Sequence, residues 1–379
     1  MIKIFLTGIT GLVGSAFTVA LLQKRKDIKI VTLARKGAVR SAQKRVEDII
    51  TDQCKFDGCP EAAHNILKSI EVIEGDVVDL DPQEMAADEM LQGVNIIFHC
   101  AADVNLGKDP EGKIHRINYG GTERMVMLAK LLNVKEFHYV STAYVAGRLK
   151  GRAMESDPVN SGFNNSYEKS KFEAESLVRH AGIPFTVYRP SIITGRLSDG
   201  RIRKPLAFYR ILEFMAKLKK HRCAKLKVDP LEWVDLHVRF KAIPSEHVYF
   251  VPIDYVQKAI TALFQKPVCN KTFHITGNSP VSTLQIDQMI CKVLKIGGVL
   301  IAPVRPDASM DEKLLSRFLG DLLPYFSSDI IFDQSNIKEV LGDEAIDWEI
   351  GERGLEVMMT SFFKDYFPNV EWLQKVIQP

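Results

Sequence analysis

Residues 1–14 read MIKIFLTGITGLVG, a short apolar run followed by three glycines at three-residue spacing. Residues 15–22 continue with an apolar helical pattern, so the segment predicts a buried strand, a tight turn and a helix. The backbone amides and the positive dipole end of such a helix favour a bound phosphate. An ordinary glycine-rich turn is the alternative, but the strand, the spacing and the helix together favour a nucleotide site. Its expected members are Gly8, Thr10, Gly11, Leu12, Val13 and Gly14.

The composition is that of an ordinary globular protein. The chain has 379 residues, enough for one large core with a smaller lobe or for two modest domains. Its net charge of +3 is too small by itself to indicate nucleic-acid binding, and no apolar run approaches the length of a bilayer span. The six cysteines are scattered, and the closest pair, Cys54 and Cys59, lacks the usual spacing of metal ligands. We therefore expect a cytoplasmic protein without a metal and without a nucleic-acid partner.

Short apolar runs recur along the first half of the chain and predict the further strands of a sheet. Helical patterns or loops separate these runs, which is typical of strands joined by crossover connections. The expected fold class is therefore α/β, a doubly wound Rossmann-type parallel sheet with a smaller, mostly helical substrate-binding lobe. The predicted strands after the first one span residues 28–33, 70–75, 94–100, 137–140 and 185–189.

The second predicted strand ends in Ala-Arg-Lys at residues 34–36, where the ribose of a dinucleotide would be recognised. An acidic side chain near this point holds a free 2′-hydroxyl, whereas an arginine suits a 2′-phosphate. No acid follows until Glu47, so Arg35, with Arg40 or Arg45 as a helper, favours NADPH over NADH. A solvated basic loop is the alternative interpretation.

Candidate catalytic residues follow the fifth predicted strand. Ser141 and Thr142 stand at its carboxyl end, where open α/β sheets place their ligands. Tyr167 and Lys171 lie four residues apart in a helical pattern and therefore share one helix face. A phenol needs a neighbouring cation to act as an acid or base near neutrality, and Lys171 supplies that charge. Thr142, with Ser141 as the fallback, can bond the same substrate oxygen, so the set predicts a general-acid site for a carbonyl attacked by hydride.

The ordered motifs from residue 7 to residue 195 resemble those of the extended short-chain dehydrogenase/reductase family. Residues 141–145, 189–195, 251–256 and 273–276 resemble, more narrowly, the branch of fatty acyl-CoA reductases and of the thioester reductase domains of carboxylic acid reductases. The resemblance implies contacts of residues 76–77 with adenine and of the segment after residue 189 with nicotinamide.

Asn118 would support the site in that family, although a helix cap at this position needs no function. Small residues after the fourth strand let the backbone pass close to the cofactor. The cofactor set is thereby extended by Arg35, Arg45, Asp76, Val77, Ala101, Ala102, Asn118, Tyr167, Lys171, Pro190, Ser191, Ile192 and Ile193.

The substrate side is expected outside the nucleotide-binding part. Residues 1–195, with a return at 245–280, form the predicted NAD(P)-binding domain, and residues 196–244 and 281–379 form the lobe. Residues 201–227 carry ten lysines and arginines against a single glutamate and show an apolar helical face. Such a helix can pack within the lobe, receive the phosphates of coenzyme A or an acidic carrier protein, or lie on an anionic membrane surface.

These patterns and the resemblance together predict an NADPH-dependent reductase. Hydride would reach the carbonyl of an acyl thioester, bound to coenzyme A or to an acyl carrier protein, or of a related aldehyde, and give aldehyde or alcohol. One alternative is an NAD(P)-dependent dehydrogenase or epimerase acting on a hydroxyl of a sterol-like or sugar-like substrate. Another alternative is a non-catalytic dinucleotide-binding regulatory module.

Overall fold

The computed structural model describes residues 1–302, 307–326, 328–345, 348–364 and 367. The chain divides into two compact units, which are described separately below. Unit 1 comprises Met1–Pro190, Val256–Ile275 and Phe332–Ala345, and unit 2 comprises Ser191–Tyr255, Thr276–Ile331 and Ile346–Pro379. The sequence places all of 281–379 in the lobe, whereas Phe332–Ala345 belongs to unit 1, because a helix of this segment packs against a strand of the unit 1 sheet.

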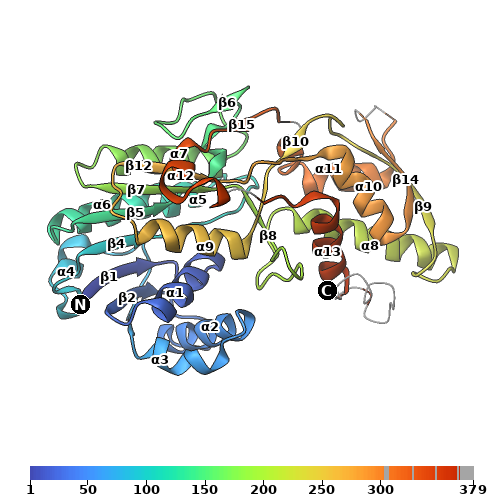
Figure 1. Cartoon of the computed structure of the whole chain (residues 1–379). Coiled ribbons are helices and arrows are strands. Elements are labelled where there is room, and N and C mark those ends of the chain that lie inside the picture. The colour runs from blue at the N-terminus through green and yellow to red at the C-terminus, as the bar shows by residue number, and fades with distance from the viewer. Residues whose placement is uncertain (303–306, 327, 346–347, 365–366, 368–379) are drawn as a thin grey trace. The chain divides into compact units, whose positions relative to one another are not determined.

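Unit 1 is built on a seven-stranded sheet with the order β12-β7-β5-β4-β1-β2-β3 (Figure 1). All neighbouring strands of this sheet pair in parallel. The strand order reverses between β1 and β4, and in open parallel sheets this switch point is where ligands bind. The strands are β1 (Ile2–Thr7), β2 (Ile28–Ala34), β3 (Ile70–Glu74), β4 (Ile96–His99), β5 (Glu136–Val140), β7 (Phe185–Pro190) and β12 (Lys271–Ile275).

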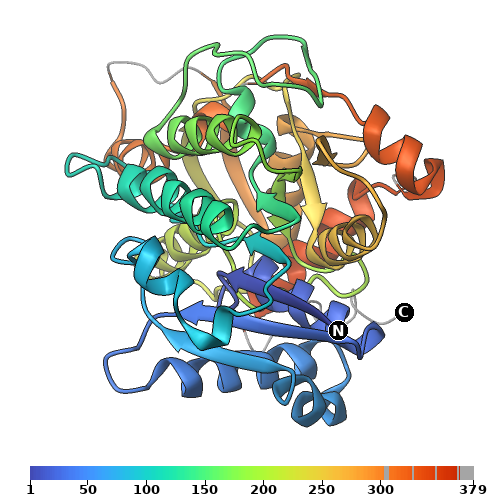
Figure 2. The same ribbon diagram turned by 90° about the vertical axis from the view of Figure 1, so that its left-hand side faces the viewer.

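Helices cover both faces of this sheet (Figures 1 and 2). On one face the ring of Phe17 in α1 stacks on Phe98 of β4 at 4.0 Å and meets Phe264 of α9 at 5.2 Å. On the other face α6 and α7 pack their apolar side chains into a core shared with Phe5 and Tyr139. The helices are α1 (Leu12–Lys24), α2 (Ala42–Phe56), α3 (Ala63–Leu67), α4 (Pro82–Ala86), α5 (Lys113–His115), α6 (Gly121–Leu131), α7 (Ser166–Arg179), α9 (Ile253–Phe264) and α12 (Ser335–Leu341).

Unit 2 combines helices with pairs of strands. Its helices are α8 (Tyr209–Leu226), α10 (Thr283–Leu294), α11 (Met310–Leu319) and α13 (Gly351–Lys364). Its strand pairs are β8 (Ile192–Thr194) with β11 (Phe250–Pro252), β10 (His247–Val248) with β13 (Val281–Ser282), and β9 (Val234–Phe240) with β14 (Ile296–Ile301). Single turns of other helix types and two short strands complete the elements: Pro60–Ala62, Glu89–Leu91, Arg116–Gly120, Ala143–Ala146, Leu323–Phe326, Asp343–Ala345, β6 (Arg152–Ala153) and β15 (Ile331–Phe332).

Residues 209–226 of the basic segment 201–227 form α8, and the apolar face of this helix packs inside unit 2. Ile211, Leu212 and Met215 are buried, and α8 contacts α10, α11, α13 and β9. Even Lys219 is buried, with its Nζ donating to the carbonyl oxygen of Leu294. The first of the three interpretations, a helix packed within the lobe, therefore describes the apolar face. Within the described ranges, no helix has the length and apolar character needed to cross a bilayer.

Candidate active site

The glycine turn between β1 and α1 folds tightly onto the end of β4. Gly8 has a φ of +85°, and a Cβ on it would lie 2.6 Å from the amide nitrogen of Ala101. A Cβ on Gly14 would lie 2.2 Å from the carbonyl oxygen of Gly8, so neither position accepts a side chain. Helix α1 starts at Leu12 without a side-chain cap and without an acid in its first turn. This backbone cradle fits a phosphate group.

Three candidate catalytic side chains meet at the carboxyl end of β5. Thr142 follows that strand directly, and Tyr167 and Lys171 lie one turn apart on α7. The Thr142 side chain lies near enough to the Tyr167 phenol to lower the pKa of that phenol. The Nζ of Lys171 donates to the carbonyl oxygen of Val140 at 2.8 Å. Thr142 and Lys171 are buried and Tyr167 is half-buried, so the Tyr167 side chain is the most open of the three.

Ser141 does not join this group. Its Oγ donates to Oε2 of Glu175 at 2.7 Å. Successive residues of an extended chain point to opposite sides, so Thr142 is directed to Tyr167 while Ser141 is directed to Glu175. The geometry therefore favours Thr142, and the fallback role for Ser141 is not supported, because its hydroxyl already bonds a buried carboxylate.

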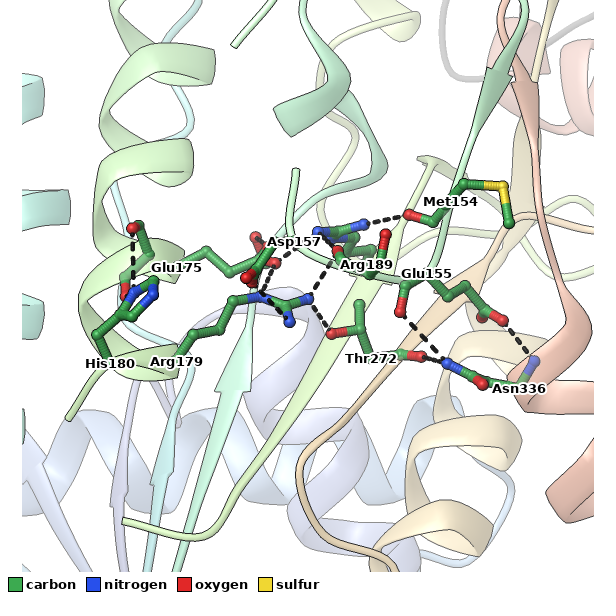
Figure 3. Close-up of polar contacts among 12 residues, drawn as sticks. Met154, Glu155, Asp157, Glu175, Arg179, His180, Arg189, Thr272 and Asn336 are labelled. Atoms are coloured by element: carbon green, nitrogen blue, oxygen red, sulfur yellow. Dashed lines mark hydrogen bonds and ion pairs between the residues drawn. The ribbon is translucent and has the colours of Figure 1, made fainter. Parts of the chain in front are cut away.

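A fully buried ion pair joins Arg189 of β7 to Glu175 of α7 (Figure 3). The guanidinium of Arg189 donates to both carboxylate oxygens of Glu175, at 2.6 and 3.1 Å, and Arg179 adds a third contact at 3.0 Å. Arg189 also donates to the carbonyl oxygens of Met154 and Ser156. Burial alone would raise the pKa of Glu175, but the two arginines and the serine hydroxyl together lower that pKa to about 2.

Burial also changes the acidity of Tyr167 and Lys171, the candidate catalytic pair. It raises the pKa of the Tyr167 phenol, against the smaller lowering effect of the hydrogen bond with Thr142. It lowers the pKa of Lys171 to about 7, against the opposing effects of Cys100 and Glu175. Tyr167 is therefore a neutral phenol with a proton to donate, and Lys171 is poised between its charged and neutral forms near neutral pH.

Asn118 lies in a π-helical turn, Arg116–Gly120, between α5 and α6. Its Nδ2 donates to the carbonyl oxygen of Asp103 at 3.0 Å and to Oγ of Ser170 at 2.9 Å. The amide of Asp103 donates back to Oδ1 of Asn118 at 2.8 Å. The helix-cap interpretation is wrong, because Asn118 lies inside a continuous helical segment. Its side-chain amide bonds the Asp103 loop and Ser170 of α7 and caps no helix.

The candidate ribose-phosphate and adenine residues meet at the ends of β2 and β3. Arg35 is exposed, and its Nη1 lies 3.4 Å from Oδ2 of Asp76. Arg45 reaches the same place from α2 and donates to the carbonyl oxygen of Arg35. Val77 is buried against Gly121 of α6. Both guanidinium groups therefore lie near the end of β2, one beside Asp76 and the other on the backbone of Arg35.

The remaining candidate cofactor residues are divided between the two units. Ala101 and Ala102 follow β4 in unit 1, where the amide of Ala101 donates to Oγ1 of Thr7 at 3.3 Å. Pro190 ends β7 and is the last residue of this part of unit 1. Ser191, Ile192 and Ile193 follow directly but belong to unit 2. The buried Oγ of Ser191 has no hydrogen-bond partner in the described part of the chain, so a ligand group can pair with it.

Sequence reasoning missed a buried chain of hydrogen bonds beside the glycine turn. The Oγ1 of Thr7 lies 2.6 Å from Nδ1 of His99, and Nε2 of His99 lies 3.0 Å from Oγ1 of Thr122. Thr122 donates its own proton to the carbonyl oxygen of Asn118 at 2.6 Å, so it accepts from Nε2–H of His99. Burial lowers the pKa of His99 to about 3, so this histidine is neutral. The only sequence signal was a histidine inside an apolar strand.

Across the described residues, no group of three or more His, Cys, Asp and Glu side chains is placed to hold a metal ion. Cys54 and Cys59 are free thiols, and burial raises the pKa of Cys54 to about 12.

Comparison with known proteins gives the chain a family. The family model described as "Male sterility protein" matches residues 6–260. The non-canonical nonribosomal peptide synthetase FrzA of Cladobotryum sp. is 24% identical over 370 residues, which are 92% of this chain and 32% of that protein. Fatty acyl-CoA reductase 1 of Gallus gallus is 32% identical over 147 residues, which are 38% of this chain and 28% of that protein.

A solved structure shares the fold. The terminal R domain from the myxalamid PKS-NRPS biosynthetic pathway aligns with a TM-score of 0.75 at 22% identity, over 97% of this chain and 92% of that one. The chain itself spans about a third of the length of the two curated relatives above. Because the family model covers well over half of the residues, and the glycine turn, the Tyr-Lys pair and every strand of the sheet from β2 to β7 lie within it, the chain belongs to the male sterility protein family, a branch of the extended short-chain dehydrogenases/reductases.

Proposed function

We propose that this chain is an NADPH-dependent reductase that acts on the carbonyl of an acyl thioester. The observation that carries the proposal is the meeting of Thr142, Tyr167 and Lys171 at the carboxyl end of β5, in the same unit as the glycine cradle. A catalytically idle dinucleotide-binding module would need none of these three side chains. The proposed setting is cytoplasmic.

The residues of unit 1 fit a dinucleotide. The cradle at Gly8 and Gly14 accepts the pyrophosphate, because only bare backbone fits there. Arg35 and Arg45 lie close together at the end of β2, and two cations at this point support a 2′-phosphate and hence NADPH over NADH. The remaining proposed cofactor contacts come from Thr10, Gly11, Leu12, Val13, Asp76, Val77, Ala101, Ala102, Asn118, Tyr167, Lys171, Pro190, Ser191, Ile192 and Ile193.

Bound NADPH would supply the hydride for the carbonyl carbon. The hydroxyls of Thr142 and Tyr167 then stabilise the negative charge that develops on the carbonyl oxygen. Tyr167 donates its proton to that oxygen, as a neutral phenol can. The ammonium of Lys171 stabilises the phenolate that Tyr167 becomes, and it also holds the ribose. With a thioester, the resulting hemithioacetal collapses to an aldehyde and a free thiol.

The choice of a thioester rests on the relatives. Their printed names include a fatty acyl-CoA reductase and a nonribosomal peptide synthetase. The thiol carrier is accordingly coenzyme A or a carrier protein, and the basic exposed face of α8 in unit 2 would favour phosphates or an acidic partner. A second hydride transfer to the aldehyde would give the alcohol.

The test is an incubation of the purified chain with NADPH and a series of acyl-CoA thioesters. We expect NADPH absorbance to fall together with release of free thiol, and the aldehyde or alcohol to appear by gas chromatography. The matched control replaces each thioester by its free fatty acid, which should not be reduced. Oxidation of sterol or sugar hydroxyls with NADP⁺, without thioester turnover, would overturn the proposal and select a dehydrogenase or epimerase.

A further inference from the structure

Lys171 lies over an aromatic ring that has no role so far. Tyr139 is on β5 and is fully buried, and the Nζ of Lys171 lies 4.1 Å from the centre of its ring. The side chain of Lys171 is itself almost completely buried. One N–H of the amine donates a hydrogen bond to the carbonyl oxygen of Val140. The ammonium therefore rests on the electron-rich face of a ring where little water can solvate it.

Glu175, the nearest acidic residue on the same helix, stabilises the charged form of Lys171 only indirectly. Glu175 lies one turn further along α7, but its carboxylate is bound by Arg189 at 2.6 Å and by Arg179 at 3.0 Å. Two arginines already compensate this single buried carboxylate, so little of its charge is left for a third cation.

The other titratable groups packed around Lys171 are uncharged. On its own helix, burial keeps the pKa of Tyr167 high. At the end of β4, burial raises the pKa of the Cys100 thiol to about 12 and lowers the pKa of His99 to about 3. None of the three supplies a negative charge at neutral pH. Glu175 raises the pKa of Lys171 from a distance, and the ring of Tyr139 is the side chain in direct contact with the amine that favours its charged form.

We infer that Tyr139 is a positioning residue, and that the face of its ring holds Lys171 as a cation under the reacting groups. The inference rests on the role of Lys171 in the proposed function. The hydroxyl of Tyr139 is buried beside Thr122 and makes no well-formed hydrogen bond within the described residues. The ring, and not the hydroxyl, is therefore the part of this side chain that acts on Lys171.

The direct test titrates Lys171 by NMR in the protein without added cofactor. Lysine labelled with ¹³C at Cε reports the loss of the ammonium proton, and a Lys171→Arg variant identifies the signal. The pKa of Lys171 in the wild-type chain should be near 7. Tyr139→Leu removes the ring and should lower that pKa by about one unit. Tyr139→Phe keeps the ring and is the matched control, so its titration should stay at the wild-type value.

A second set of variants protects the test against misfolding of Tyr139→Leu. Phenylalanines with increasing numbers of ring fluorines at position 139 keep nearly the same shape while they withdraw the negative charge from the ring face. The pKa of Lys171 should fall stepwise with each added fluorine. An unchanged titration along this series, or an equal shift in Tyr139→Phe and Tyr139→Leu, would overturn the inference.

The pH profile of kcat/KM gives an activity readout. Activity requires charged Lys171, so kcat/KM should fall as the pH rises through the pKa of Lys171. This alkaline limb of the profile should move to lower pH in Tyr139→Leu and stay in place in Tyr139→Phe. A change in overall activity at all pH values, without movement of the limb, would mean that Tyr139 only supports the fold. The NMR titration does not depend on turnover. If the chain reduced no thioester, the proposed function would be refuted. The titration would still decide whether the ring of Tyr139 holds Lys171 as a cation.

Discussion

The two units bury their strands in different ways. In unit 1 every residue of β7 is buried, and so are all residues of β5 except the first. In unit 2 the residues of β9 alternate between buried and exposed at its start, and β14 exposes or half-exposes five of its six residues. A parallel sheet covered on both faces needs unbroken apolar strands, whereas a strand covered on one face alternates. Side chains of β5 and β7 therefore have few alternative positions, while the outer faces of β9 and β14 are open to solvent.

The same contrast appears in the ion pairs. Glu175 and Arg189 in unit 1 form a pair with almost no exposure. Lys217 and Glu213 in unit 2 form a pair of similar length, 2.6 Å, on the exposed face of α8. A buried pair becomes very costly when one partner is removed, whereas an exposed pair contributes little. Position in the fold, more than contact distance, therefore decides what each pair is worth.

The largest expected difference between the units is catalytic. Tyr167→Phe in unit 1 removes a single oxygen, and it should lower kcat by roughly 10²–10⁴-fold, because no other group donates the proton. The affinity for NADPH, measured by fluorescence titration, should change far less than kcat, because Tyr167 is one of many proposed cofactor contacts.

The matched control is Tyr209→Phe in unit 2. Tyr209 is also a buried phenol, and its oxygen accepts a hydrogen bond from the amide of Gly195 at 2.7 Å. Its loss should reduce the free energy of unfolding by about 1 kcal/mol and leave kcat near the wild-type value. Equal losses of kcat in the two variants would contradict the assignment of the proton to Tyr167.

The two ion pairs should also differ in what they contribute to the free energy of unfolding. Arg189→Met leaves the Glu175 carboxylate buried with less compensation, so the free energy of unfolding should fall by about 3–5 kcal/mol. Lys217→Met on α8 should change it by no more than about 0.5 kcal/mol. Urea denaturation followed by circular dichroism measures both values. A double variant with Glu175→Leu should recover part of the loss, and similar effects of the two single variants would refute the contrast.

The smallest expected effect concerns an exposed residue of unit 1. Arg35→Ser should weaken NADPH binding about tenfold, because a charged hydrogen bond to the 2′-phosphate is lost, and it should leave NADH binding unchanged. Arg40→Ser is the control, since that guanidinium is paired with Asp48 at 2.7 Å. Isothermal titration with each cofactor decides the matter. An equal change for both cofactors would remove Arg35 from the phosphate site.

Much of unit 1 could be predicted from local sequence. The predicted strand at residues 28–33 is β2 at Ile28–Ala34, and the predicted glycine turn connects β1 to α1. Buried parallel strands appear in the sequence as continuous apolar runs. At Gly14 a Cβ would lie 2.2 Å from a backbone oxygen, so no residue other than glycine fits there. The observed sheet confirms the predicted α/β fold, and the match to the family model confirms the predicted family.

The rest depends on contacts between distant residues. The pair β9 and β14 was missed, although residues 234–240 alternate, because the partner strand lies far along the chain. The return of Phe332–Ala345 to unit 1 has no local signal either. The choice between Ser141 and Thr142 required knowing which side of the strand end faces α7 at Tyr167. The roles of these site residues stay predictions until the variants are measured.

The order in which the strands of unit 1 occur along the chain has a consequence for its synthesis on the ribosome. Strand β7 ends at Pro190, but its outer neighbour β12 begins only at Lys271. During translation a nascent chain therefore carries six of the seven strands while one edge of β7, an apolar strand, still lacks its partner. Unpaired apolar edges of this kind are where growing chains aggregate or recruit chaperones. A slow stretch of translation between residues 190 and 271 would prolong this vulnerable state.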